Sequence, residues 1–187
     1  MGDPPGSSIS IRQATTPDQL AAVAACFRAY VEWLGEDISF QNYESELQSL
    51  PGKYAEPAGA LLLATDDDSS EAGLNVLGCI ALRPIDVPAD YYREDDDGGG
   101  QQRRRRRYAE LKRLFVYPEA RGRRVARVLI REAIGRAREQ GYDEVVLDTL
   151  GRMTAAVSLY KSEGFQEVGA YYHNPLNGVV YMGMSLR

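Results

Sequence analysis

The chain has 187 residues, of which 44% are hydrophobic and 26% are charged. These values are ordinary for a globular protein, and they exclude a wholly disordered, collagen-like or disulfide-built chain. A single domain of this length buries roughly 70% of the surface that its unfolded chain would expose, so we expect a sizeable core. The net charge of −5 argues against a general nucleic-acid binder.

Histidine and cysteine usage narrows the possible chemistry. His173 is the only histidine, which excludes a histidine-based metal cluster, and we expect no metal. Cys26 and Cys79 lie in separate apolar stretches, as buried thiols do. The polar N-terminus does not resemble a signal peptide, and no stretch approaches the ~20 apolar residues of a membrane span. We therefore expect a cytoplasmic protein that does not bind membranes.

The first elements of the chain carry clear start and stop signals. Residues 9–13 alternate in polarity and predict a strand. Thr16 and Gln19 match the two positions of a capping box, and apolar residues follow at helical spacing over 17–34. Gly35 is a typical residue for ending that helix.

The middle of the chain predicts a short helix, two strands and an insertion. Apolar residues at helical spacing favour a helix over 40–50, and apolar runs at 61–64 and 76–82 favour strands. The second run is nearly continuous, which indicates burial on both faces of the sheet. A low-complexity loop follows at about residues 90–107 and ends in the five arginines Arg103–Arg107.

The next segment predicts a strand, a turn and a helix. Residues 111–116 have the pattern of a strand, and 118–122 have that of a turn. Apolar residues from Ala126 to Ala137 then follow the spacing of an amphipathic helix that ends at Gly141.

The last segment predicts a strand at 145–147, a helix at 154–161 and two closing strands at 166–172 and 179–186. The complete order β-α-α-β-β-β-α-β-α-β-β indicates an α/β (α+β) fold with helices packed on a mixed sheet. We expect one domain over residues 8–187, preceded by a disordered tail at 1–7.

The turn before the long helix is the segment best suited to bind a phosphate. A helix N-terminus offers unpaired amides and the positive end of the helix dipole. Gly122 lets the backbone approach a ligand closely, and positive charge comes from Arg121, Arg123, Arg124 and Arg127. These features together predict a pyrophosphate site. The alternative is that the arginines form the solvated face of an ordinary helix.

Two motifs resemble the signatures of the GCN5-related N-acetyltransferase (GNAT) superfamily. Residues 110–122, Glu-Leu-Lys-Arg-Leu-Phe-Val-Tyr-Pro-Glu-Ala-Arg-Gly, are similar to its central strand and pyrophosphate loop. Residues 159–165, Leu-Tyr-Lys-Ser-Glu-Gly-Phe, are similar to its second signature. The resemblance implies a single-domain fold with a mostly antiparallel central sheet. It also implies transfer of an acetyl group from acetyl-CoA, or of the acyl group of a related acyl-CoA, to a primary amine of a small molecule or an exposed peptide, by direct attack through a ternary complex. We expect a monomer or a homodimer.

The resemblance also assigns residues to acetyl-CoA. The backbone of the central strand would bind the pantetheine arm, at Leu114, Phe115 and Val116. The pyrophosphate loop would comprise Arg121, Gly122, Arg123, Arg124, Val125, Ala126 and Arg127. Arg124 replaces a glycine that is usual in the family, and we expect its φ to be negative because the residue would already begin the helix. Met153 replaces a frequent asparagine.

The resemblance implies two catalytic residues. Glu110 corresponds to the general base of several relatives and could act directly or through water; the alternative is a carboxylate paired with Lys112 or a nearby arginine. Tyr160 corresponds to the tyrosine that protonates the thiolate of CoA; the alternative is an aromatic ring packed in the core. His173 ranks below Glu110 as a base. The candidate residues for the acceptor pocket are Tyr30, Trp33, Glu36, Asp37, Tyr171, Tyr172 and His173.

Two other classes of function are weighed against catalysis. The replacements at Arg124 and Met153 leave open a non-catalytic acyl-CoA-binding module on the same fold. Arg103–Arg107 could bind a nucleic acid or a partner, but a solvated loop fits an acidic chain better, and we expect no nucleic acid. The acid-rich remainder of the chain fits a cationic amine as acceptor.

Overall fold

The computed structural model describes residues 8–66, 74–88, 91 and 106–187. The predicted disordered tail at 1–7 and most of the predicted insertion at 90–107 lie outside this part of the chain. Of the arginine run, Arg106 and Arg107 are described, and the guanidinium of Arg107 lies over the ring of Tyr142 at 4.9 Å from the centroid. The backbone amide of Arg107 also donates to Asp143 at 2.8 Å, so this end of the run packs on the domain.

Within the described residues, seven strands form one sheet in the order β1-β2-β3-β4-β5-β7-β6. Their bounds are β1 Ile9–Gln13, β2 Ala60–Asp66, β3 Val76–Ile85, β4 Tyr108–Val116, β5 Glu144–Leu150, β6 Gln166–Glu167 and β7 Val179–Ser185. Neighbouring strands are antiparallel except β4 and β5, which are parallel. The mixed, mostly antiparallel sheet and the order of elements confirm the predicted fold class.

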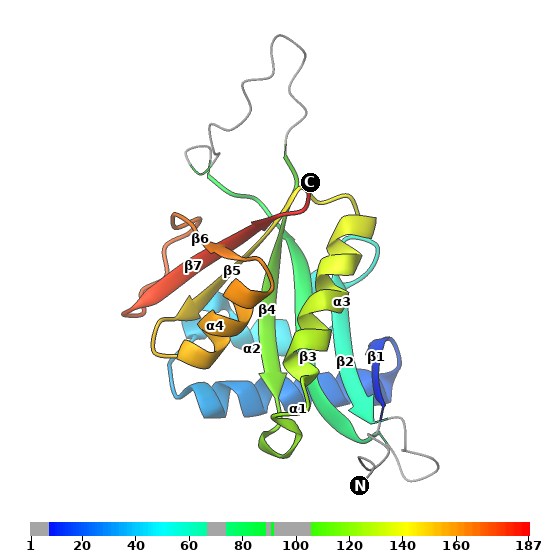
Figure 1. The fold of residues 1–187 in the computed structure, drawn as a ribbon. Coiled ribbons are helices and arrows are strands. Elements are labelled where there is room, and N and C mark those ends of the chain that lie inside the picture. The colour runs from blue at the N-terminus through cyan, green and yellow to red at the C-terminus, as the bar shows by residue number, and fades with distance from the viewer. Residues whose placement is uncertain (1–7, 67–73, 89–90, 92–105) are drawn as a thin grey trace, which may run out of the picture.

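Helices cover both faces of the sheet (Figure 1). On one face lie α1 and α2, and on the other lie α3 and α4. Their bounds are α1 Pro17–Leu34, α2 Tyr43–Gln48, α3 Val125–Glu139 and α4 Thr154–Ser162, with short 3₁₀ turns at Ser39–Gln41, Gly52–Tyr54 and Pro118–Ala120. No helix in the described ranges is both long enough and apolar enough to cross a membrane.

The sequence signals explain why these elements begin and end where they do. Thr16 and Gln19 form the predicted capping box at the start of α1, and Gly35 ends the helix in the left-handed conformation at φ 67°. Along β2, Leu61 packs with the core under α1, whereas Leu62 packs with the core under α3. Successive side chains of the strand point to opposite faces and pack into two different cores. The central strands are therefore apolar on both faces.

Several elements differ from the prediction, since β4 begins at Tyr108 and β5 ends at Leu150, both beyond the expected bounds. The helix expected over 40–50 is a 3₁₀ turn followed by the shorter α2, and β3 continues through Pro84 to Ile85. The strand expected over 166–172 ends at Glu167, because the chain then turns inward and buries Tyr171. Burial of a large aromatic ring outweighs the few hydrogen bonds that a longer edge strand would add.

The parallel strands β4 and β5 separate part-way along their length. They pair only from Tyr108 to Glu110 on β4 and from Glu144 to Val146 on β5, and Figure 1 shows them diverging beyond that point. The register of β4 with β3 also shifts, at a bulge where Arg113 has a φ of 57°. Backbone groups of β4 beyond Glu110 therefore have no strand partner on the β5 side, and the sheet opens into a cleft.

Candidate active site

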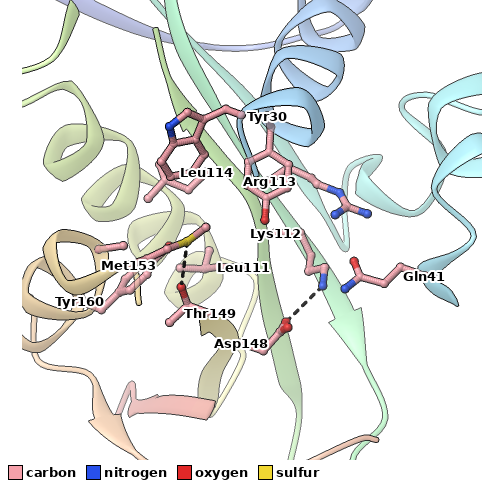
Figure 2. Close-up of a pocket in the computed structure, with 12 residues that line it drawn as sticks. Tyr30, Gln41, Leu111, Lys112, Arg113, Leu114, Asp148, Thr149, Met153 and Tyr160 are labelled. Atoms are coloured by element: carbon pink, nitrogen blue, oxygen red, sulfur yellow. Dashed lines mark hydrogen bonds and ion pairs between the residues drawn. The ribbon is translucent and has the colours of Figure 1, made fainter. Parts of the chain in front are cut away.

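The cleft between β4 and β5 is the candidate active site. Side chains from both strands, from α4, and from the first helical layer line it (Figure 2). The lining residues are Tyr30, Trp33, Gln41, Leu111, Lys112, Arg113, Leu114, Asp148, Thr149, Met153, Ala156 and Tyr160. Tyr160 and Met153 lie on one side of the cleft, and Lys112 and Gln41 lie on the other.

Tyr160 contributes a hydroxyl group that can donate a proton. Helix α4 holds the ring against Phe165, with the ring centroids 5.7 Å apart. Among the described residues, none forms a hydrogen bond with the Tyr160 hydroxyl, although the group lines the cleft. Burial raises the pKa of Tyr160, and the nearby Tyr30 and Asp148 add to the effect. The hydroxyl is therefore protonated at neutral pH and available to a ligand.

Asp148 supplies a carboxylate at the opening of the strands. Lys112 donates to one carboxylate oxygen at 3.2 Å, and Tyr172 and Asn174 each donate to the other at 2.9 Å. Burial alone would raise the pKa of Asp148, but the charge of Lys112 and these hydrogen bonds outweigh it, so the pKa is lowered. Asp148 is therefore ionised at neutral pH.

Glu110 lies behind the cleft, at the last position of β4 that pairs with β5. Its side chain is fully buried, and Arg83 on the neighbouring strand places two nitrogens 2.6 Å from one carboxylate oxygen. The hydroxyl of Tyr171 donates to the other oxygen at 2.8 Å, and Nζ of Lys112 lies 3.8 Å from it. Both oxygens are thus engaged, and Glu110 does not line the cleft. Direct contact with an amine would require these bonds to rearrange.

Arg113 ties the bulge of β4 to α2. Its guanidinium donates to both oxygens of Glu46, at 2.8 and 3.2 Å, and the hydroxyl of Tyr54 also donates to Glu46. Burial opposes ionisation of Glu46, but Arg113 outweighs it and lowers the pKa to about 2. This buried ion pair fixes the side chain of Arg113 beside α2, at the edge of the cleft.

The predicted pyrophosphate loop lies at the start of α3. Arg124 precedes the helix and has a φ of 64°, so the expectation of a negative φ was wrong. The helix begins one residue later, at Val125, and Arg124 takes the left-handed conformation that glycine adopts without strain. The first i→i−4 hydrogen bond of α3 runs from the amide of Val128 to the carbonyl of Arg124. The amides of Val125, Ala126 and Arg127 therefore precede the helical hydrogen-bond pattern.

The other arginines of this loop have protein partners. Arg123 forms an ion pair with Asp66 at 3.0 Å, and Arg127 forms one with Glu163 at 3.1 Å. The guanidinium of Arg121 lies over the exposed ring of Trp33, 5.3 Å from its centroid. These contacts orient the arginine side chains, and Gly122 between them is exposed.

The remaining predicted residues lie in different environments. Leu114 lines the cleft, whereas the side chain of Phe115 is buried in the core under α1 and that of Val116 is half-buried. Among the acceptor candidates, Tyr30 and Trp33 line the cleft. Tyr172 and His173 line a neighbouring cavity, Tyr171 is buried beside Glu110, Glu36 pairs with Arg152, and Asp37 caps the turn at Ser39.

Sequence reasoning missed Asp148, Lys112 and Gln41 as residues of the site. Asp148 directly follows the buried run Val145–Leu147, and a polar residue at the end of a buried strand is a signal that could have identified it. Lys112 alternates with Glu110 along β4, so a strand register could have placed both on one face. Gln41 carries no comparable signal.

Comparison with known proteins agrees with this geometry. The model of the acetyltransferase (GNAT) family matches residues 23–165. The chain belongs to this family. An uncharacterized N-acetyltransferase of Schizosaccharomyces pombe is 35% identical over 180 residues, which cover 96% of each chain. An uncharacterized N-acetyltransferase of Dictyostelium discoideum is 32% identical over 213 residues, covering 91% of this chain and 96% of its own.

Solved structures share the fold of this GNAT protein. Arabidopsis thaliana NAA60 in complex with acetyl-CoA superposes with a TM-score of 0.66 at 17% identity, covering 95% of this chain and 98% of its own. A chain of the NatC complex bound to Gag peptide and CoA superposes with a TM-score of 0.66 at 21% identity, covering 96% and 99%. The family match and the relatives establish the protein as an acyl-CoA-dependent N-acetyltransferase.

Proposed function

We propose that the protein transfers the acetyl group of acetyl-CoA to a primary amine of a small molecule or an exposed peptide, by direct attack in a ternary complex. The observation that carries this proposal is the cleft between β4 and β5, into which Tyr160 presents a hydroxyl with no hydrogen-bond partner among the described residues. Direct attack requires both substrates to meet in one cleft. The residues of the first helical layer reach the same opening from the other side.

The described residues fit acetyl-CoA. Beyond Glu110, the edge of β4 that faces β5 lacks a strand partner, so its backbone groups can pair with the amides of a pantetheine arm. The amides at the start of α3 and the exposed Arg124 supply donors and positive charge for the pyrophosphate. In this proposal, amides at the bulge near Leu114 polarise the thioester carbonyl.

The reaction forms a C–N bond and breaks a C–S bond. The neutral amine attacks the thioester carbon, the amide product forms, and the thiolate of CoA departs. Tyr160 donates a proton to that thiolate, or holds it by a hydrogen bond, because its raised pKa keeps the phenol protonated. The nitrogen loses one proton to water as the amide forms, and water returns one proton to the Tyr160 phenolate, so that the net change moves one proton from nitrogen to sulfur.

The amine must lose a proton before it attacks, because its unperturbed pKa is ~10.4. Glu110 remains our predicted base, and its engaged oxygens favour the route through water over direct contact. Asp148 lines the cleft and is ionised. We therefore propose that it accepts a hydrogen bond from the amine and so orients it.

Mass spectrometry of the purified protein with acetyl-CoA and a pooled library of amines tests this function. The expected result is one or more products heavier by an acetyl group, with stoichiometric release of CoA thiol. The strained backbone at Arg124 keeps a second candidate, a non-catalytic acyl-CoA-binding module, in consideration. Tight binding of CoA without turnover of any amine would favour that module.

A further inference from the structure

A second cavity adjoins the cleft on the side away from α4. It has a volume of about 250 Å³ and is lined by residues of the first helical layer, of β3 and β4, and of the segment before β7. These residues are Phe40, Gln41, Asn42, Glu46, Lys53, Arg83, Lys112, Tyr172 and His173. Gln41 and Lys112 line both this cavity and the cleft, so the two spaces are adjacent. We call this second space the basic cavity.

The basic cavity is lined by more cations than anions. Lys53, Arg83 and Lys112 carry positive charge, and Glu46 is the one carboxylate among its lining residues. Most of the protein is acidic, with a net charge of −5. The local charge of this cavity is thus opposite to that of the whole chain.

The acids that pair with these cations are mostly buried, and Asp148 pairs with Lys112 at 3.2 Å. The side chain of Glu46 is 2% exposed and is neutralised by Arg113. Glu110, which pairs with Arg83, is fully buried behind the wall. In contrast, the side chains of Lys53 and Arg83 are 35% and 27% exposed. Lys53 and Arg83 are therefore the more exposed cations of the lining, whereas Lys112 is 7% exposed and paired with Asp148.

The electrostatics of Lys53 are consistent with an unbalanced positive charge. Burial lowers the pKa of Lys53, and Glu46 raises it in part, but the charges of Arg83 and Arg113 add to the lowering. The contact between Lys53 and Glu46 is long, at 3.4 Å, and is shared with the shorter bonds from Arg113 to the same carboxylate. An anion bound here would relieve the repulsion among these cations.

We infer that the basic cavity binds an anionic group of the acceptor, a carboxylate or a phosphate, so that the substrate class is an amine that also carries an acidic group. This inference rests on the proposed function, because it assigns the acceptor of the same reaction. Charge-assisted hydrogen bonds from a lysine and an arginine are the strong contacts for such groups. The acidic group anchors the molecule in the basic cavity while its amine lies in the cleft near Asp148.

The test compares pairs of acceptors that differ only in the acidic group. Each α-amino acid of a panel is paired with its carboxamide, and phosphoethanolamine is paired with ethanolamine. The wild-type protein is expected to have a kcat/KM at least tenfold higher for the acidic member of a preferred pair. Preference for phosphoethanolamine identifies a phosphate, and preference for an amino acid identifies a carboxylate.

Lys53→Gln is the diagnostic variant, because the side chain is partly exposed and lies outside the cleft. It is expected to raise KM for the acidic acceptor about tenfold, with little change for the carboxamide and in the Kd of acetyl-CoA. Arg12→Gln is the control, since Arg12 is exposed on the edge strand β1. Equal kcat/KM values for both members of every pair would overturn the inference while leaving the proposed transferase function intact.

A binding measurement keeps the two failures distinct. Calorimetric titration with an N-acetyl amino acid and with its carboxamide, in the presence of CoA, measures the Kd of each ligand without turnover. Tighter binding of the acid, weakened about tenfold in Lys53→Gln, shows that the basic cavity binds an acidic group, even if every amine in the panel proves inert and the proposed function fails. Equal binding of the acid and the carboxamide overturns it.

Discussion

Glu110 of β4 and Arg83 of β3 are cross-strand partners whose charged groups meet 2.6 Å apart behind the cleft. The guanidinium places two nitrogens on one carboxylate oxygen, and Tyr171 donates to the other. The predicted base and a wall of the basic cavity are therefore one structural unit. A change at Glu110 affects the stability of the sheet as well as any proton transfer.

Glu110→Gln is expected to destabilise the protein by about 3 kcal/mol, because it leaves the half-buried guanidinium of Arg83 without its counter-charge. Denaturant unfolding measures this loss. Glu132→Gln, which breaks an exposed ion pair with Arg136 on α3, is the matched control and should cost less than about 0.5 kcal/mol.

The pH dependence of the same variant tests the role of Glu110 as base. If Glu110 removes the proton of the amine, kcat/KM of the folded Glu110→Gln variant falls most near neutral pH and partly recovers at high pH, where solvent deprotonates the amine. A profile parallel to that of the wild type, after correction for the folded fraction, would remove Glu110 from the proton transfer.

Tyr160→Phe is expected to lower kcat by roughly a hundredfold while leaving the Kd of acetyl-CoA unchanged. The hydroxyl has no described protein partner to lose, so the fold is retained. Release of CoA thiol measures kcat. Tyr142→Phe is the control, because that hydroxyl donates to the carbonyl of Ala58 at 2.5 Å, outside the cleft. A wild-type rate in Tyr160→Phe would show that Tyr160 only packs in the core.

The Glu46 carboxylate is expected to contribute to acid stability. Its pKa is lowered from 4.5 to about 2 in the folded protein: burial opposes the charge, and Arg113 outweighs burial. A lowered folded-state pKa gives stability that is present above pH 4.5 and is lost as the pH falls toward about 2. The contribution is about 3 kcal/mol at neutral pH.

Denaturant unfolding between pH 7 and 2 checks this contribution. Glu46→Gln should be less stable at neutral pH and should lose less of its remaining stability on acidification than the wild type does. Glu44→Gln, at an exposed position of α2, should follow the wild-type curve. If Glu46→Gln and the wild type lose equal free energy over this range, the Arg113 pair does not set the acid stability.

Arg124→Gly is expected to stabilise the protein by about 1 kcal/mol, because a left-handed backbone strains every residue except glycine. For a chain of this size, that gain raises Tm by about 2–4 °C. Arg121→Gly is the contrasting variant: its φ is −66° and its side chain lies over Trp33, so the substitution should lower Tm. Equal shifts in the two variants would mean that charge, and not backbone strain, decides the effect.

Local signals of the sequence were sufficient for most of the fold. The capping box at Thr16, the left-handed Gly35 and the periodicity of α3 concern neighbours within a few residues, and the structure confirms them. The prediction of a strand over 166–172 was wrong because the burial of Tyr171 depends on residues distant in the chain. The prediction of a negative φ for Arg124 was wrong because α3 begins one residue later, and the start of the helix depends on how the chain enters it from β4.

The sequence by itself determined the order of elements, the two family motifs and the placement of Tyr160 on a helix beside Gly164 and Phe165. Periodicity, caps and motifs are local, so they can be read along the chain. Only the tertiary structure decided that β4 and β5 separate after Glu110, that Asp148 lines the resulting cleft, and that Lys53 and Arg83 meet in one cavity. These relationships depend on strand pairing and burial between segments far apart in sequence. The net charge of the whole chain does not reveal the local positive charge of the basic cavity.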